Sequence, residues 1–235
     1  ILFLNEDVDG TTERTNETLD FTRSNHYVLG YDVKLSNNGR GKLEVYYQDI
    51  DKAGVEPFPS RYSTLTEGAN FGFDNDRVSL VNEGTGYNTG LEITLERFFN
   101  NGYYGLLTGS FFESKYTGSD GIERDTRFNG NYIFNTTIGK EWSWQGRKNK
   151  TRRLGINGRI AYLGGFRATP IDVDASVASG ATVFQDELAF TLQQKDYFRT
   201  DLRFYYKTSK ANSNNTWSLD IQNATNQENI AFSYF

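Results

Sequence analysis

The residues that this sequence lacks exclude several classes of protein. It has no cysteine, so disulfide bonds and thiolate chemistry are excluded. Its single histidine, His26, cannot build a histidine-based metal cluster, and no Ser or Cys triad accompanies it. No run of about 18 apolar residues is present, so no transmembrane helix is expected. The opening stretch 1–4 is too short for the core of a signal peptide.

An excess of positive charge and methionine are also absent. The net charge is −5, which does not suit a general nucleic-acid surface, so no nucleic-acid partner is expected. Methionine is absent, and we therefore expect a processed product or a piece of a longer polypeptide. The mean hydropathy of −0.64 is polar, yet aromatic residues make up 15% of the chain. A polar chain rich in aromatics is typical of either a soluble β-protein or an outer-membrane β-barrel.

The residues that are present alternate with a period of two. In the segment 90–99, Leu91, Ile93 and Leu95 alternate with polar residues, which predicts a strand with one apolar and one charged face. Similar patterns predict about eight strands, at 24–36, 40–50, 87–99, 102–116, 128–142, 151–163, 195–207 and 215–224. The alternation in 102–116 is blurred and does not assign its faces. No segment has a convincing helical period.

The connections between these segments alternate between short and long. The short ones follow the first, third, fifth and seventh strands, and "NNG" at 100–102 is a strong hairpin signal. The long ones cover roughly 51–86, 117–127 and 164–194, and they contain all three prolines. Residues 1–23 are expected to end another such loop. Short turns at one end and long loops at the other are typical of an outer-membrane barrel, with the short turns periplasmic.

Strand length and aromatic placement favour the same interpretation. Segments of about 10–13 residues suit tilted membrane-spanning strands, which need about 9–11, whereas soluble strands usually have about 5–6. Aromatic residues gather near strand ends, as interfacial girdles would require. The sequence therefore predicts an all-β fold, an antiparallel transmembrane β-barrel in which the apolar face of 90–99 meets lipid. We expect the charged face to line the lumen, with these candidates: Glu92, Glu96, Arg159, Arg199, Asp201, Arg203 and Asp220.

Other candidate sites have simpler interpretations. His26 is expected near a strand end or on the lumen side, without a catalytic role. The pairs Asp74/Asp76 and Asp172/Asp174 lack the spacing of an EF-hand, so solvated loop charges are expected rather than Ca²⁺ ligands. The basic cluster at 147–153 is expected to be a solvated turn, with contact to lipid phosphates as the alternative. No catalytic residue, metal site or cofactor is predicted, and ligand contact is expected in the loops 51–86 and 164–194.

Five stretches spread over most of the chain resemble the C-terminal barrel region of Bacteroidetes-type TonB-dependent outer-membrane receptors. They are "LDFTRSNHYVLGYD" (19–32), "LVNEGTGYNTGLEITLERFF" (80–99), "TGSFFESKYTGSDGIERDTRFNGNYIFN" (108–135), "TPIDVDASVASGATVF" (169–184) and "WSLDIQNATNQENI" (217–230). The resemblance implies a 22-stranded barrel around an N-terminal plug. Residues 1–235 would form its C-terminal portion, about eight strands, without the plug and the earlier strands.

The resemblance also implies a function and partners. Such receptors bind a scarce solute, for example a metal chelate or another nutrient, and import it across the bacterial outer membrane with energy from TonB. The implied partners are outer-membrane lipid and lipopolysaccharide, a small solute, and the TonB complex through the missing N-terminal part. A surface lipoprotein partner is less expected, because the pattern of the large glycan importers is not seen.

Two alternatives remain open at the level of sequence. The first is a complete small outer-membrane barrel of eight strands, whose interior would have to pack Arg, Asp and Glu side chains. The second is a soluble β-sandwich that binds carbohydrate through exposed aromatic residues. A sandwich predicts that Leu91, Ile93 and Leu95 pack against a second sheet.

Overall fold

A computed structural model describes residues 3–6, 12–67, 79–147 and 150–230 of the chain. Most of these residues form antiparallel strands, so the predicted all-β class is confirmed. The main sheet contains eight long strands: β3 (Arg23–Ser36), β4 (Gly39–Val55), β5 (Val81–Asn100), β6 (Tyr103–Thr117), β8 (Tyr132–Gly146), β9 (Lys150–Leu163), β12 (Tyr197–Lys210) and β13 (Ser213–Ile221). They correspond one to one with the predicted segments, although most are longer.

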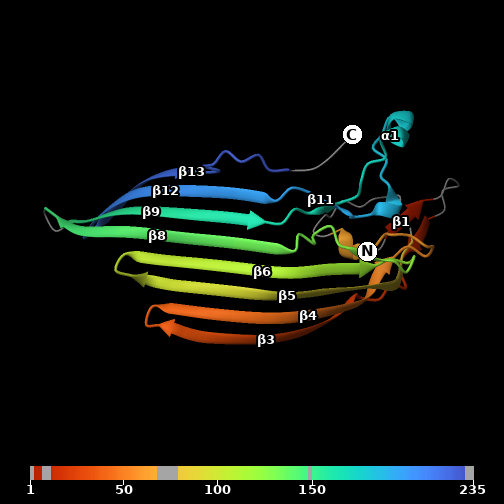
Figure 1. Cartoon of the computed structure of the whole chain (residues 1–235), viewed down its shortest axis with the longest axis horizontal. Helices are drawn as coiled ribbons and strands as arrows, with labels where there is room; N and C mark the ends of the chain where they lie inside the picture. The colour runs from red at the N-terminus through yellow and green to blue at the C-terminus, as the bar shows by residue number, and fades with distance from the viewer. Residues whose placement is uncertain (1–2, 7–11, 68–78, 148–149, 231–235) are drawn as a thin grey trace.

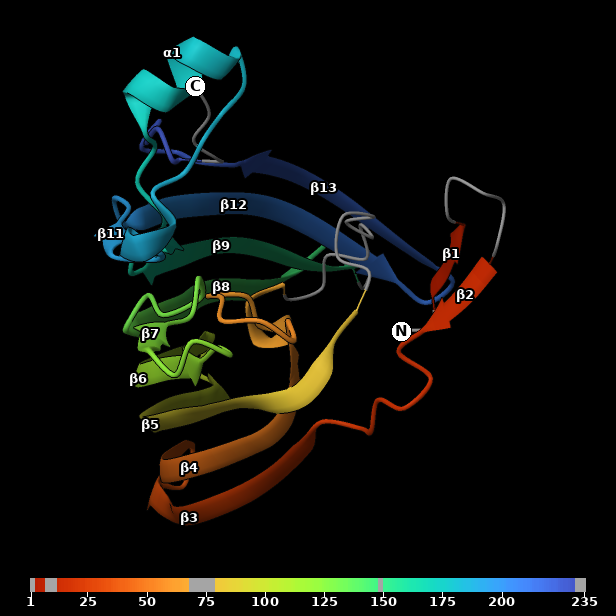
Figure 2. The ribbon, with the colours of Figure 1, turned by 90° about the vertical axis from the view of Figure 1, so that its right-hand side faces the viewer.

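The eight strands form one meander in which each strand pairs with its neighbours in the chain. Their order is β13-β12-β9-β8-β6-β5-β4-β3, and all pairs are antiparallel. The sheet is curved and open, and β3 and β13 lie at opposite ends of the arc (Figure 2). Among the described residues, β3 and β13 therefore each have one edge without a strand partner, and the sheet itself is not a closed barrel.

The two ends of the sheet differ as the sequence predicts. The four hairpin connections of the main sheet, β3–β4, β5–β6, β8–β9 and β12–β13, lie at one end, at the left of Figure 1, which we call the hairpin end. Asn101 and Gly102, between β5 and β6, have φ values of 52° and 78°, as a two-residue type I′ hairpin requires. The long connections β4–β5, β6–β8 and β9–β12 all lie at the opposite end, the loop end (Figure 1).

The long connections contain short elements that the sequence does not predict. These are β7 (Glu123–Asp125), β10 (Arg167–Ala168), α1 (Val173–Ser179), η1 (Thr64–Thr66), η2 (Asp186–Leu188) and β11 (Leu192–Gln193), while β1 (Phe3–Glu6) and β2 (Thr12–Thr15) form a hairpin before β3. The helix α1 occurs although no segment of the sequence has a convincing helical period. With only seven residues, α1 is defined by its ends, the cap Asp172 and the left-handed Gly180 (φ 70°), rather than by a helical period.

The register separates two faces that run across the whole sheet. One row of paired residues reads Tyr31, Leu43, Ile93, Gly109, Phe134, Tyr162 and Phe198 from β3 to β12. The adjacent row on the other side reads Lys34, Arg40, Glu96, Leu106, Thr137, Arg159 and Asp201. We call these sides the apolar face and the polar face.

The register also assigns the faces of β6, which its sequence leaves undefined. Leu107 and Phe111 lie on the apolar face, because they pair with Leu95 and Leu91. Glycines alternate with these two residues at positions 105 and 109, and Leu106 lies on the polar face opposite Glu96. The pattern is blurred because glycine occupies two of the apolar-face positions, while Leu106 lies on the polar face.

Tyrosine rings cover glycine positions on the polar face. In each case the ring lies over the glycine that faces it on the neighbouring strand, an arrangement that shields a strand glycine. The pairs are Tyr46 with Gly90, Tyr104 with Gly139 and Tyr205 with Gly155. The Tyr104 hydroxyl then donates to Asn157 at 2.6 Å, and the Tyr205 hydroxyl donates to Glu141 at 2.7 Å. Each tyrosine thus ties three adjacent strands together.

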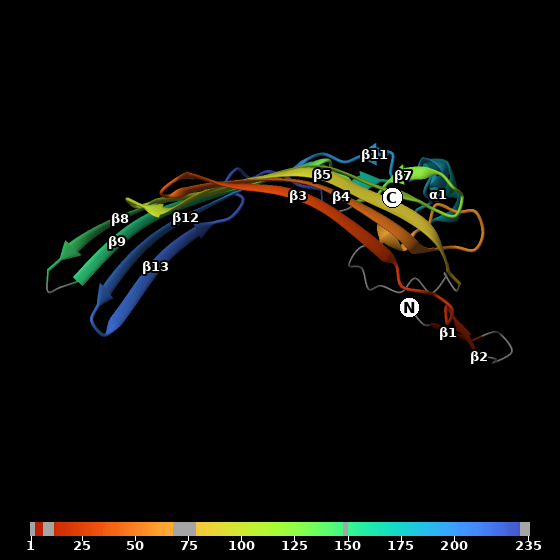
Figure 3. The same cartoon turned by 90° about the horizontal axis from the view of Figure 1, so that it is seen from below.

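The small core lies at the loop end on the polar face. The segment 56–67, which carries η1, folds back over the concave side of the arc (Figure 2). Tyr116 is fully buried beneath it, and its hydroxyl donates to the backbone carbonyl of Arg61 at 2.9 Å. Val55 and Ser63 are also fully buried. The strands bow along their length, as Figure 3 shows from below. The apolar face carries no second sheet among the described residues.

Candidate functional site

All seven predicted lumen-facing residues lie on the polar face. Five of them gather on β9, β12 and β13, where Asp201 accepts a hydrogen bond from Arg199 Nε at 2.7 Å and from the Asn223 backbone at 2.9 Å. Arg159 faces Asp201 across the β9–β12 ladder. Arg203 and Asp220 face each other on β12 and β13, with 3.4 Å between Nε and Oδ1. Their assignment to a lumen stays a prediction.

Glu92 and Glu96 lie apart from this cluster on β5. Glu96 Oε2 is 3.9 Å from Arg40 Nη1, and Arg40 also pairs with Asp32. Glu92 faces Ser110 on β6 and Glu44 on β4. The seven predicted residues thus form two groups rather than one site.

The remaining sequence candidates have structural surroundings that explain them. His26 lies near the loop end of β3 on the polar face, and its Nε2 is 2.8 Å from Gln48 Nε2. Asp172 caps α1 by accepting from the Ala175 backbone N–H at 2.9 Å, and Asp174 follows in the first turn. Asp74 and Asp76 lie outside the described residues. No group of three or more potential metal ligands occurs in the part of the chain that the structure describes.

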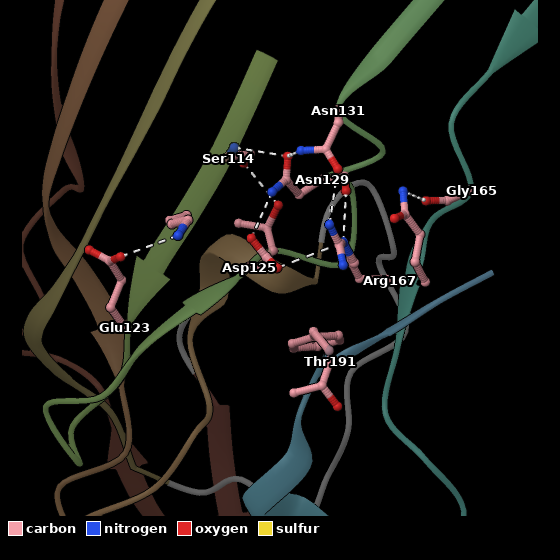
Figure 4. Close-up of polar contacts among 12 residues, drawn as sticks. Ser114, Glu123, Asp125, Asn129, Asn131, Gly165, Arg167 and Thr191 are labelled. Atoms are coloured by element: carbon pink, nitrogen blue, oxygen red, sulfur yellow. Dashed lines mark hydrogen bonds and ion pairs between the residues drawn. The ribbon is translucent and has the colours of Figure 1, made fainter. Parts of the chain in front are cut away.

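A network of polar side chains joins β6, β8 and the β9–β12 connection at the loop end (Figure 4). Its centre is Asn129, which is buried, donates to Asp125 at 2.7 Å and accepts from the Ser114 backbone at 3.2 Å. Arg167 donates to the carbonyl of Asn129 at 3.1 Å and to Asn131 at 2.9 Å. This network anchors the long loops to the sheet, and sequence reasoning missed it because its members are far apart in the chain.

A pocket of about 720 Å³ opens between the three long connections. Its walls are residues 56 and 58–62 from the β4–β5 connection, 120, 122 and 124 from the β6–β8 connection, and 186–187 from the β9–β12 connection. The first and third of these connections are the loops 51–86 and 164–194 in which ligand contact was expected. Ligand contact in these loops stays a prediction.

Direct contacts hold together the walls of this pocket, which we call the loop pocket. Ser119 Oγ donates to the carbonyl of Phe58 at 2.6 Å and accepts from the Ser60 backbone at 3.0 Å. Arg61 donates to Asp186 at 2.6 Å, which joins the first wall to the third. The pocket is therefore braced by side-chain contacts between segments that are over a hundred residues apart.

An ion pair at the base of the pocket is shielded from solvent. Arg124 and Asp120 are 2.7 Å apart, and their side chains are 9% and 17% exposed. Burial raises the pKa of the Asp120 carboxyl, but hydrogen bonds from Arg124 and from the Ile122 backbone outweigh it and hold the pKa below its usual value. The sequence signal for this pair is the four-residue spacing of Asp120 and Arg124 in "DGIER".

The charges around the pocket are unequal. Four carboxylates line it, from Glu56, Asp120, Asp186 and Glu187, against the two guanidinium groups of Arg61 and Arg124. Phe58, Pro59, Tyr62 and Ile122 supply apolar or aromatic surface. A few charged groups around an apolar patch are typical of sites that orient a small solute.

Comparisons with known proteins give no relative for this chain: no family model, curated protein or solved structure matches it. None of the helices in the described ranges has the length and apolar character needed to cross a membrane.

Proposed function

We propose that this chain is part of a TonB-dependent outer-membrane receptor that imports a scarce solute, such as a metal chelate or another nutrient. One observation carries the proposal: an apolar face extends across eight strands without any covering layer among the described residues. Leu29 is 74% exposed, Leu219 61% and Trp217 76%. An apolar surface of this extent marks an interaction site, and lipid is the partner whose chemistry fits a whole sheet face.

The spacing of aromatic residues supports a bilayer on that face. Phe134 and Trp142 on β8 are eight residues apart, as are Phe198 and Tyr206 on β12, and all four lie on the apolar face. Eight residues extend for about 26 Å along a strand. With a strand tilt of about 35–45°, this length corresponds to about 19–22 Å along the membrane normal, so the rings would lie near the two edges of the apolar band, which is about 25 Å tall and flanked by aromatic girdles.

The two other architectures receive less support. A β-sandwich requires a second sheet against Leu91, Ile93 and Leu95, and the other sheets among the described residues are two-stranded. A complete eight-stranded barrel requires β3 to pair with β13, whereas these strands lie at opposite ends of an open arc (Figure 2). The free edges of β3 and β13 favour closure by further strands, as in a larger barrel.

The loop pocket is the proposed contact with the solute. It lies at the loop end, which faces outside in this orientation, and it includes both connections in which ligand contact was expected. The polar face would line the lumen and pack against a plug, while TonB would act through a segment outside this chain. We propose no covalent chemistry, and a surface lipoprotein is not required.

The chain offers a direct test of location and orientation because it has no cysteine. Two variants of the polypeptide, as the cell makes it, are prepared separately. One carries Glu187→Cys in the loop pocket, and the other carries Ala211→Cys in the β12–β13 turn. In intact cells a membrane-impermeant maleimide should label only the first, and both should react after the outer membrane is opened. Labelling of both in intact cells, or recovery of the protein in the soluble fraction, would contradict the proposal.

Energy coupling needs a second test that does not require the solute. Formaldehyde treatment of cells should give an adduct between the native polypeptide and TonB, with a known TonB-dependent receptor of the same cells as the positive control. An adduct with the control receptor alone would be compatible with a membrane location but would contradict coupling to TonB. A heat-shifting band near 26.8 kDa would instead favour a small complete barrel.

A further inference from the structure

A groove of about 990 Å³ runs across the apolar face towards its hairpin end. Apolar side chains from six strands line it, namely β3, β5, β6, β8, β9 and β12. They lie in neighbouring rows of the sheet register, since Leu95 pairs with Leu107 while Gly158 pairs with both Ile138 and Leu202. Its apolar lining includes Leu95, Leu107, Ile138, Ile156 and Leu202. Gly105 and Gly158 add no side chain, which deepens the surface between the larger residues. An elongated apolar guest would fit this shape.

Cations lie where the groove reaches the hairpin end. Arg97 and Lys140 both line it and both lie on the apolar face. Lys140 Nζ lies 3.4 Å from the centre of the Tyr103 ring and donates to the carbonyl of Asn101 at 2.9 Å. Among the described residues, no ion pair joins either cation to a carboxylate. The carboxylate that does line the groove, Glu96, extends from the polar face and is close to Arg40.

The rest of the hairpin-end rim has the same sign. Lys150, Arg152 and Lys210 also lie on the apolar face, as the pairing of Trp144 with Arg152 and then Thr208 shows. The Nε of Arg152 is shielded and has no hydrogen-bond partner in the part of the chain that is described. The loop-end rim differs, because Asp49, Glu113 and Asp196 lie there. The apolar band is thus basic at one edge and largely acidic at the other.

We propose that this groove binds an anionic glycerophospholipid, with an acyl chain along its apolar walls and the phosphate on Arg97 and Lys140. The inference rests on the proposed function, since it requires this face to lie in a bilayer. A guanidinium group matches the oxygens of a phosphate bidentately, and an ammonium group adds a second point charge. Tyr103 and Trp142 beside Lys140 are amphipathic rings suited to the depth of lipid headgroups.

Charge and position argue for a phospholipid over other occupants. A second copy of this chain in the same bilayer would have the same orientation, so it would bring its own basic rim, rather than its acidic rim, to these cations. In the proposed orientation the hairpin end is periplasmic, so the lipid belongs to the inner leaflet, where each nearby cation favours anionic headgroups. The acidic loop-end rim would not attract the same headgroup.

The test uses the full polypeptide, purified from its membrane and placed in phosphatidylcholine nanodiscs. Phosphatidylglycerol is titrated in, and retention of single lipids is measured by native mass spectrometry. The double variant Arg97→Gln/Lys140→Gln is compared with Lys34→Gln/Lys207→Gln, which removes two cations from the polar face at the same end. The first should weaken phosphatidylglycerol retention about tenfold or more, and the second by less than about twofold. Heat-modifiability on gels confirms that both variants fold.

Each result separates this inference from the proposed function. Equal retention of phosphatidylglycerol and phosphatidylcholine, or equal losses in the two double variants, would overturn the lipid site while leaving the membrane location intact. A crosslink from Ile138→Cys to a protein or to a second copy of the chain would also overturn it. Absence of the native protein from the outer membrane would overturn the proposed function and this inference together.

Discussion

The two faces of the main sheet are built from the same strands, yet they achieve order in different ways. On the polar face, hydroxyl, amide and charged groups find partners across the strands: Tyr104 bonds Asn157, and Arg199 bonds Asp201. On the apolar face, large side chains such as Ile138 and Trp217 remain exposed, at 60% and 76%. The polar face satisfies its own polar groups, whereas the apolar face has no covering layer among the described residues.

This difference indicates what each face tolerates. A face whose side chains pack against one another should lose stability when a residue changes size, because specific tyrosine rings lie over its glycines. A face that contacts lipid should lose stability when a charge is introduced, and hardly any when a side chain changes shape, since acyl chains adapt to the new surface. Each of the following predictions therefore places matched changes on the two faces or at their boundary.

The largest effect is expected from a charge placed on the apolar face. Leu107→Lys changes a residue midway between Tyr103 and Phe111 on β6, while Thr108→Lys makes the same addition on the polar face. A lysine near the middle of a bilayer costs about 2–4 kcal/mol. Urea titration of the full polypeptide in lipid vesicles should show that loss of unfolding free energy for the first variant, and a much smaller loss for the second.

The opposite result would be informative as well. Leu107 is 40% exposed, so in water a lysine there would cost little. Equal and small losses for Leu107→Lys and Thr108→Lys would contradict a lipid environment. A larger loss for Thr108→Lys would mean that the assignment of the two faces to lipid and lumen is reversed.

The next effect concerns fit on the polar face. A Cβ atom on Gly155 would lie 2.1 Å from the Tyr205 ring, so Gly155→Ala must displace the ring and its bond to Glu141. Gly158→Ala, on the same strand but the apolar face, meets no atom closer than 3.7 Å. Overpacking costs about 1–3 kcal/mol, so the free energy of unfolding should fall by about that amount for Gly155→Ala and little for Gly158→Ala.

A double-mutant cycle identifies the cause. Tyr205→Ala removes the ring that the new methyl group would meet, so adding Gly155→Ala to it should cost little. Unfolding free energies of the four proteins give the coupling between the two positions. Additive losses would show that the glycine matters for backbone freedom instead of for the tyrosine ring.

The strands and turns were predictable because their signals are local. Alternation in segments such as 87–99 and the turn at Asn101 and Gly102 depend on neighbouring residues, and the structure has both. The faces of β6 were not predictable, since Gly105 and Gly109 interrupt the apolar pattern. Helix α1 escaped because seven residues are too few for a helical period, although Asp172 and Gly180 are visible signals in retrospect.

The loop pocket was only partly predictable. The connections that were expected to contact a ligand follow from loop length and from the end of the sheet at which they lie. Its shape depends on contacts such as Arg61 with Asp186, which join positions 125 residues apart, and no local pattern encodes them. The same reason applies to the network around Asn129, where the sequence shows separate polar residues and only folding brings them together.

A smaller effect is expected where the loops are anchored at the boundary of the polar face. Asn129→Ala leaves the Ser114 backbone N–H and the Asp125 carboxylate without this partner. A lost hydrogen bond of this kind costs about 1 kcal/mol. Hydrogen exchange of the 112–118 region should therefore accelerate about fivefold. Asn214→Ala, at an exposed position of β13, is the control and should leave the exchange unchanged.

The smallest effect concerns a carboxylate at the loop-end boundary of the apolar face. The hydroxyls of Tyr132 and Tyr162 both donate to Asp196 Oδ2, at 2.5 and 2.7 Å, and hold the pKa of that carboxyl below its usual value. A depressed pKa in the folded state adds stability above the unfolded pKa of about 3.9, and this stability is lost as the pH falls through the folded pKa. Because the group is largely solvated, the contribution should be below about 1 kcal/mol.

Unfolding free energies measured between pH 6 and pH 3 test this contribution against a matched variant. Tyr132→Phe/Tyr162→Phe keeps the rings and the carboxylate but removes both donors. Its free energy should lie below that of the parent protein near pH 6, and the two should converge as the pH falls below about 4. A constant difference across the range would mean that the hydroxyls stabilise the fold independently of the charge on Asp196, for example through their own contact at 3.3 Å. In that case the charge of Asp196 would contribute no stability at the loop end of the apolar face, and the difference between the two faces would hold along the whole length of the strands.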